Sequence, residues 1–207
     1  SKAALSNYLM PVFTAVLVIV GILLLTGTRY ETYRSGVSLL TLFVGPATVA
    51  LAIPLYAQRE RIKELWLPIS AALLVGCVVA MVSALSIGWV LGGSETTLIA
   101  LMPKSATIPI ALPMAERFGA PGSLAAVAVA ITGISGTMMS PLLCRLLRTQ
   151  DPAVKGFALG LTAHAIGTAR ALQVNPTSGA FSALAMGLNG VATAILMPMV
   201  LAAMSWL

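Results

Sequence analysis

Long apolar runs separated by short polar stretches dominate this chain. Six runs reach or exceed the roughly 20 residues that an α-helix needs to cross a bilayer. They cover 8–26, 36–57, 66–92, 120–144, 154–174 and 178–206. The pattern predicts an all-α integral membrane protein with six to seven transmembrane helices, organised as a single transmembrane domain over residues 1–207.

One stretch between these runs, residues 92–121, fits neither a loop nor a straight helix. Pro103, Pro109 and Pro113 divide it, and prolines at this density break helices because each removes a backbone donor. It is either one broken span or a re-entrant hairpin with its tip at Pro103–Lys104. The positive-inside rule favours the hairpin, because a single span divides the Lys/Arg residues five against five, whereas a hairpin gives seven against three. The seven are Lys2, Arg59, Arg61, Lys63, Arg145, Arg148 and Lys155.

A weak internal repeat supports the hairpin topology. The segments 47–55 and 106–114 share four of nine residues, and each follows a proline that is expected to interrupt a helix. With a hairpin, the two copies run through the membrane in opposite directions. We therefore expect inverted repeats whose broken helices meet near the midplane, as in many secondary transporters. Chance similarity in Ala/Pro-rich sequence is the alternative.

The composition agrees with a bilayer environment. Of all residues, 58% are hydrophobic and 9% are charged, against roughly 25% charged residues in soluble domains. The net charge of +6 comes from basic residues scattered through short loops, which is typical of membrane proteins and does not indicate nucleic-acid binding. Cys77 and Cys144 lie within apolar runs, so we expect buried small side chains and neither a disulfide nor a metal site.

A Gly-Pro pair at residues 45–46 is the first of three interruptions inside the apolar segments. Backbone groups freed by such a break are tolerated in a membrane only where they face protein or a water-filled cavity. If Thr48 caps the helix that follows Pro46, the positive end of that helix points into the protein. A simple proline kink is the alternative.

The second interruption is the segment MPKSATIPIA, residues 102–111. It contains Lys104, which lies at membrane depth in either topology. An unpaired ammonium group at this depth costs at least about 2.5–3.5 kcal/mol, which makes it a functional candidate unless it snorkels to the interface. Ser105 or Thr107 can cap the arm that follows, with Pro109 in its first turn. A lysine, two hydroxyl groups and free backbone N–H groups around one point predict an anion site.

The third interruption holds the only histidine, His164, with Thr168 on the same expected helix face and Arg170 nearby. An unbroken helix would direct Arg170 elsewhere, whereas a break at Gly167 would turn both basic groups toward one cavity. All six acidic residues lie in or beside loops, so an anionic substrate is expected to pair with Lys104, His164 and Arg170. If transport is coupled to protons, His164 is the candidate proton carrier.

A protease active site is the competing interpretation of His164. The sequence GISG at 133–136, followed by this histidine, resembles the Ser–His pair of rhomboid intramembrane proteases. The match is short and lies in a segment of small residues, which are typical of closely packed membrane helices. We therefore expect that the chain is not an enzyme.

Four segments together resemble the signature blocks of the LrgB/CidB family: GPATVALAIPLY, PKSATIPIA, AHAIGTARAL and GAFSALAMGLNG. The resemblance covers nearly the whole chain in the family's order and spacing. It departs at Ala106 and Ile108, where members usually have valine and threonine. Pro54 is among the positions that match these blocks. The resemblance implies a substrate site formed by Pro46, Thr48, Lys104, Ser105, Thr107, His164, Gly167, Thr168, Arg170 and Asn189.

The same resemblance implies a function. The family includes bacterial inner-membrane proteins and the C-terminal half of the plastid glycolate/glycerate transporter, so a multi-pass inner-membrane carrier of small monocarboxylates such as glycolate, glycerate or pyruvate is expected. Some members are described as holin/antiholin-like regulators of murein hydrolases and autolysis, which is the alternative. The expected partners are the carboxylate, the lipid bilayer, an LrgA/CidA-type membrane protein and a second copy of the chain; no cofactor is expected.

Overall fold

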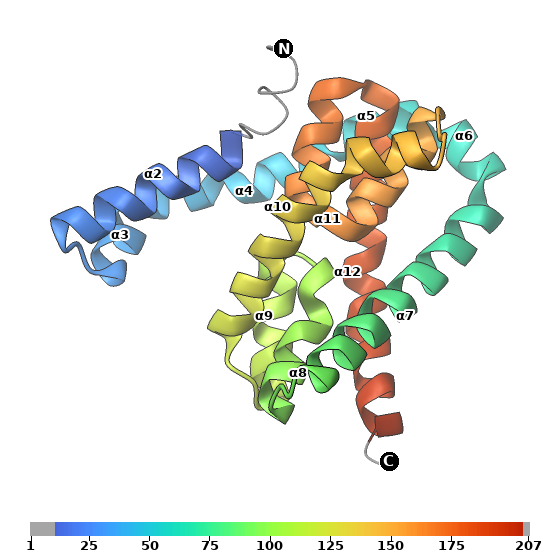
Figure 1. Ribbon diagram of the computed structural model, residues 1–207. Helices are drawn as coiled ribbons and strands as arrows, with labels where there is room; N and C mark the ends of the chain where they lie inside the picture. Colours follow the sequence, from blue (N-terminus) through green and yellow to red (C-terminus); the bar gives the residue numbers. More distant parts are fainter. Residues whose placement is uncertain (1–10, 205–207) are drawn as a thin grey trace. The chain divides into compact units, whose positions relative to one another are not determined.

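The computed structural model describes residues 11–204, which are almost entirely helical (Figure 1). Four helical segments are long and apolar enough to cross a membrane: Ser38–Ala57, Trp66–Val90, Gly122–Leu146 and Pro176–Ala203. The prediction of an all-α membrane protein is therefore confirmed. The predicted position of Lys2 lies outside the described residues. The chain divides into two compact units, Ser1–Tyr56 and Ala57–Leu207.

The first unit contains helices α2 (Pro11–Thr26), α3 (Tyr30–Gly36) and α4 (Ser38–Ala50), and α5 (Ala52–Ala57) follows α4 directly. Helix α4 continues through Pro46 and ends at Ala50, so the predicted break at residues 45–46 is wrong. The chain is interrupted at Leu51 because Pro54, four residues after Ala50, has no N–H to donate to its carbonyl group. Thr48 is not a cap, since its hydroxyl donates to the carbonyl oxygen of Val44 at 2.8 Å inside the helix.

The second unit is built on three long helices, α7 (Trp66–Val90), α10 (Gly122–Leu146) and α12 (Pro176–Met204), with the short α6 (Arg59–Glu64) preceding α7. Helices α7 and α12 run in the same direction, because contacts between them advance together along both sequences. Helix α10 runs in the opposite direction (Figure 1). The residues of α7 and α12 that meet, in order, are Ile69 and Phe181, Cys77 and Asn189, and Met81 and Met197.

A helical hairpin connects α7 to α10. It consists of α8 (Glu95–Leu101), a 3₁₀ turn η1 (Met102–Ser105) and α9 (Ile108–Arg117). At 1.5 Å per residue, α8 is about 10 Å long and α9 about 15 Å, so neither crosses a hydrocarbon core of about 30 Å. Helix α10 begins at the end of the unit where α7 finishes (Figure 1). The predicted re-entrant hairpin is therefore present.

Helix α11 (Pro152–Val174) contains a sharp reversal, because His164 has non-helical torsion angles of φ 41° and ψ −129°. Leu159 and Ala163, before the reversal, lie close to Gly167, after it. A Cβ atom added to Gly167 would lie 2.8 Å from the carbonyl oxygen of Leu159. Leu159, Ala163 and Ala171 also form one buried cluster. Residues 165–174 thus fold back along residues 152–163.

The packing of α12 confirms this reversal. Gly156 lies against the backbone of Ser178, and Gly160 lies against the backbone of Ser182, so α12 runs parallel to the first arm of α11. A single residue, Asn175, separates α11 from α12. With so short a connection, α12 can run parallel to the first arm of α11 only if the second arm runs back to the end where the first arm begins. The prediction that 154–174 spans the membrane is therefore wrong, and so is the predicted break at Gly167: the break is at His164.

The second unit therefore contains two helical hairpins of opposite direction. The first enters from the end where α7 finishes, and the second enters from the end where α10 finishes (Figure 1). The order long helix, hairpin, long helix occurs twice, with α10 shared. This arrangement agrees with the expectation of inverted elements meeting near the midplane. The proposed repeat between 47–55 and 106–114 joins two different units and stays a prediction.

An ion pair links the loops on one end of this unit. Arg61 in α6 donates to both carboxylate oxygens of Asp151, at 2.9 and 2.8 Å, and Asp151 also caps α11 by accepting from the backbone N–H of Ala153. The segment before α7, which includes α6, and the loop after α10 therefore lie at the same end of the unit, as the hairpin topology requires. We call this end, formed by residues 57–65 and 145–155, the basic end. Arg117 lies at the opposite end, where α9 finishes.

Candidate functional site

The tips of the two hairpins meet at one buried side chain, Asn189, near the middle of α12. Its amide nitrogen donates to the carbonyl oxygen of Ser105 at 2.7 Å and to that of Leu161 at 3.2 Å. Its amide oxygen accepts a hydrogen bond from the thiol of Cys77 at 2.9 Å. One side chain thus joins α7, the first hairpin, the second hairpin and α12.

The reversal at His164 explains why the Leu161 carbonyl group needs such a partner. Helical hydrogen bonds from residues 165, 166 and 167 would pass across His164 to the carbonyl groups of residues 161, 162 and 163. Non-helical torsion angles at His164 disrupt this pattern. A carbonyl group released within a membrane protein must find another donor, and the Asn189 amide supplies it to Leu161.

The first tip carries Lys104 and Ser105. Ser105 is buried, whereas Lys104 is half-buried and its ammonium nitrogen lies 3.5 Å from the Ser105 hydroxyl oxygen. Thr107 occupies the N-cap position of α9 without a capping bond from its side chain, and Pro109 lies in the first turn. The geometry of the arm agrees with the sequence prediction, except that its first turn is not capped by a hydroxyl group.

The second tip carries His164, which is buried between α11 and α10. Its Nε2 atom lies 2.9 Å from the carbonyl oxygen of Val129. Gly133 allows this approach, since a Cβ at that position would lie 2.6 Å from the imidazole ring. Because Val129 and Gly133 lie in the middle part of α10, the imidazole is at a similar depth to Asn189.

Thr168 belongs to a neighbouring polar contact between the second arm and α12. Its hydroxyl group donates to the His164 carbonyl oxygen at 2.8 Å and lies 2.9 Å from the Ser182 hydroxyl oxygen. The imidazole and this hydroxyl group therefore face different helices, α10 and α12. The prediction that His164 and Thr168 share a helix face is wrong, because the reversal begins at His164.

The structure brings together some of the predicted site residues. Lys104, Ser105 and Asn189 form one group, His164 and Thr168 form a second, and Leu161 links the two through Asn189. Gly167 packs against the first arm of α11, and Arg170 is half-buried in the second arm. The remaining predicted residues, Pro46 and Thr48, belong to the first unit, as does Pro54.

Four residues of this network were not predicted from the sequence: Cys77, Val129, Leu161 and Ser182. Cys77 was expected as a buried apolar side chain; it is buried, and its thiol also donates to Asn189. Val129 and Leu161 contribute only backbone carbonyl oxygens, which leave no residue-specific signal. Ser182 could have been found because it is the one residue with a hydroxyl group within GAFSALAMGLNG. All buried side-chain nitrogen and oxygen atoms in the described part of the chain have hydrogen-bond partners.

Comparison with known proteins identifies a family and several relatives. The LrgB-like family matches residues 1–203. The protein named YwbG of Bacillus subtilis (strain 168) is 37% identical over 197 residues, covering 95% of this chain and 88% of the relative. YxaC of the same organism is 35% identical over 193 residues, covering 93% and 84%.

A further relative has a name that refers to a role. The "antiholin-like protein LrgB" of Bacillus mycoides (strain KBAB4) is 30% identical over 189 residues, covering 91% of this chain and 82% of the relative. The protein of the same name from Bacillus cereus (strain B4264) is 29% identical over the same length. No solved structure matches the chain.

Proposed function

Since this chain belongs to the LrgB-like family, we propose that it is an antiholin-like protein of the bacterial inner membrane that regulates murein hydrolase activity and autolysis. The observation that carries the proposal is the similarity, over most of the chain, to relatives named antiholin-like protein LrgB. The fold is compatible with this role, because α7 and α10 expose apolar side chains that can pack against other membrane helices, such as those of an LrgA/CidA-type partner.

The test is an autolysis assay in a bacterial host that lacks its own LrgB relatives. Cells that produce the chain should lose turbidity more slowly after detergent-induced autolysis than cells that carry an empty vector. A chain with Gly160→Ala, in which the added Cβ meets the α12 backbone, should be less stable and should slow autolysis less than the unchanged chain. Equal autolysis rates with and without the folded chain, at verified levels in the membrane, would contradict the proposal.

A second candidate function is transport of small monocarboxylates such as glycolate, glycerate or pyruvate. The observation that favours it is the meeting of two oppositely directed hairpin tips at Asn189, with the Lys104 ammonium group at one tip. Interrupted helices that meet at mid-depth form the substrate sites of many secondary transporters. The acidic residues of the second unit lie at helix ends, so a substrate carboxylate would complement Lys104, with His164 and Arg170 supporting the site from the second hairpin.

Counterflow in proteoliposomes tests this candidate with labelled glycolate, glycerate and pyruvate. A carrier should show saturable exchange that Lys104→Ala abolishes and Lys104→Arg partly preserves. Lys63→Gln, at an exposed position in α6, should have no effect. A pH gradient should drive uptake if His164 carries a proton, and His164→Gln should remove that dependence. A non-saturable flux that none of these substitutions alters would indicate a pore instead.

Neither candidate function is enzymatic. The Ser135 hydroxyl group donates to the carbonyl oxygen of Ile131 at 2.7 Å, within α10, and the imidazole of His164 contacts Val129. These contacts support the proposal that the two residues do not act as a catalytic pair. Ser135→Ala should therefore leave both the autolysis effect and any exchange activity unchanged.

A further inference from the structure

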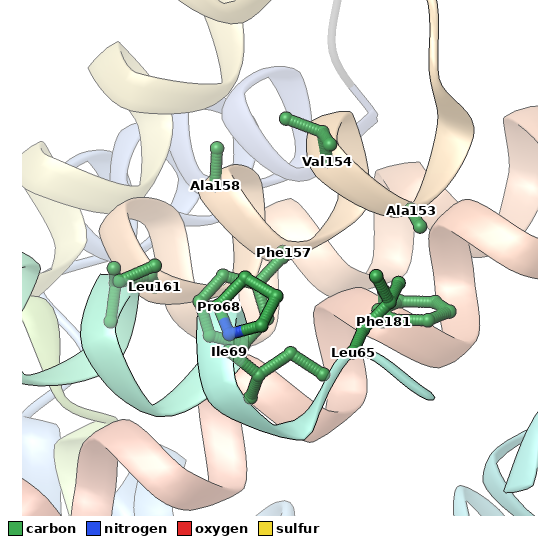
Figure 2. A pocket seen from close by; sticks show the side chains of 10 residues that line it. Leu65, Pro68, Ile69, Ala153, Val154, Phe157, Ala158, Leu161 and Phe181 are labelled. Atoms are coloured by element: carbon green, nitrogen blue, oxygen red, sulfur yellow. The ribbon is translucent and has the colours of Figure 1, made fainter. Parts of the chain in front are cut away.

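An apolar groove lies between the N-terminal part of α7 and the first arm of α11 (Figure 2). Its volume is about 280 Å³, and all ten residues that line it are apolar. The floor is formed by the buried side chains of Ile69, Phe157 and Phe181, whereas Pro68 and Ala158 on the rim are exposed. The groove is thus open at the surface of the second unit, and α7 is long and apolar enough to lie within a bilayer.

The groove ends beside charged groups at the basic end. Arg61 lies 5.9 Å from the centre of the Phe181 ring and is paired with Asp151, and Lys63 lies 3.4 Å from Glu60. The ammonium nitrogen of Lys155, next to the groove residue Val154, lies 3.5 Å from the neutral amide oxygen of Gln150, and Lys155 forms no ion pair with the acidic residues of the described part of the chain. Six Lys or Arg residues and three Asp or Glu residues lie within 57–65 and 145–155, so this end carries a net positive charge.

The dimensions of the groove limit what can occupy it. Its volume lies near the lower end of the roughly 300–1,000 Å³ range of ligand sites. An α-helix with its side chains is about 10–12 Å across, so a groove of this volume receives no more than the side chains of one turn. A segment of an extended hydrocarbon chain is thinner than a helix and matches this purely apolar lining. A positive charge at the mouth selects an anionic group at the end of that chain.

We propose that this groove binds one acyl chain of an anionic phospholipid, whose phosphate group lies beside Lys155. The cytoplasmic leaflet has a negative surface potential that attracts basic segments, and the positive-inside rule places the basic end on that side. The site is separate from the contacts of Asn189, and the inference does not depend on which of the two candidate functions is correct. The lipid would hold the first arm of α11 against α7 at the point where the second hairpin enters the membrane.

Native mass spectrometry and thermal unfolding of the full chain in detergent test this proposal. Phosphatidylglycerol should bind and raise the melting temperature more than phosphatidylcholine with the same acyl chains. Ala158→Phe fills the groove from the α11 side and should weaken phosphatidylglycerol binding about tenfold, the effect of excluding about two buried methylene groups. Lys155→Gln should weaken it about fivefold and should weaken phosphatidylcholine binding less, because the choline group offsets the charge of the phosphate.

Two controls keep the test decisive. Ala72→Phe fills the same groove from α7 and should reproduce the effect of Ala158→Phe, so a folding defect of one variant does not decide the outcome. Arg117→Gln removes a positive charge at the opposite end and should change nothing. Equal binding of both lipids, or full binding to both filled variants, would overturn the proposal. A disulfide formed readily between Ala158→Cys and Ile53→Cys would also overturn it, because a helix of the first unit would then occupy the groove.

Discussion

Replacement of Asn189 gives the strongest test of the network that joins the two hairpins. Asn189→Ala removes both donor bonds of the amide, to Ser105 at 2.7 Å and to Leu161 at 3.2 Å. It also removes the acceptor of the Cys77 thiol. Because Asn189 is 1% exposed, water does not readily replace the lost bonds. Two backbone carbonyl groups at mid-depth therefore lose a donor at the same time.

The expected loss of stability follows from these two bonds. Hydrogen bonds between membrane helices contribute about 0.6 kcal/mol on average and at most about 1.7 kcal/mol, so two bonds correspond to roughly 1–3 kcal/mol. In soluble chains of this size, 1 kcal/mol lowers the melting temperature by about 2–4 °C. We therefore expect the Asn189→Ala chain to melt roughly 2–12 °C lower in detergent.

Two further variants separate the donor groups of Asn189 from its shape. Asn189→Asp keeps the size of the side chain but replaces the donating amide with a carboxyl group, so it should destabilise the chain at least as much as alanine does. Thr193→Val is the matched control, because the Thr193 hydroxyl group lies 3.5 Å from the Asn189 amide oxygen and contributes little. If Asn189→Asp melts at the temperature of Thr193→Val, the amide does not hold the hairpin tips and the reasoning is refuted.

Three other predictions concern the hairpins and their packing. His164→Gly should be more stable than His164→Ala by about 1 kcal/mol or more in denaturant unfolding, because φ is positive at residue 164. If the alanine variant is the more stable one, as in an ordinary helix, the reversal is refuted. Gly160→Ala should destabilise the chain by at least about 1–3 kcal/mol, since a Cβ meets the α12 backbone, whereas Gly187→Ala, in open space, should not. In a cysteine-depleted background, Gln150→Cys should react with an impermeant maleimide from one side of the membrane and Arg117→Cys from the other; labelling from the same side would refute the hairpin topology.

Hydropathy and charge were sufficient to predict the helical membrane class and the first hairpin. Pro103 and Pro109 mark the tip and first turn of that hairpin because proline restricts the backbone wherever it occurs. The second hairpin was missed because its reversal occurs at His164, within an apolar stretch that has the length of a single span. The residue types do not reveal that a non-glycine residue adopts a positive φ angle, so the segment 154–174 was predicted to be one helix.

The candidate site was predicted in part for a similar reason. Lys104 was found because a charged side chain is costly in a membrane and therefore conspicuous in an apolar sequence. Asn189 was found only through the resemblance of GAFSALAMGLNG to a family signature block. The main partners of Asn189 are the backbone carbonyl groups of Ser105 and Leu161, and every residue possesses a backbone carbonyl group. Only the fold determines which carbonyl groups lose their helical donors, so the contacts of Asn189 could not be predicted from residue types.

The connections of the two hairpins differ in length, and this difference restricts how each can shift. Residues 91–94 and 118–121 give the first hairpin slack on both sides. The second has a loop of several residues after α10, but Asn175 alone ties its other arm to α12. If the second tip is displaced, its second arm must therefore pivot at Asn175, while the longer loop after α10 lets the first arm shift. The two hairpins cannot open by equivalent motions.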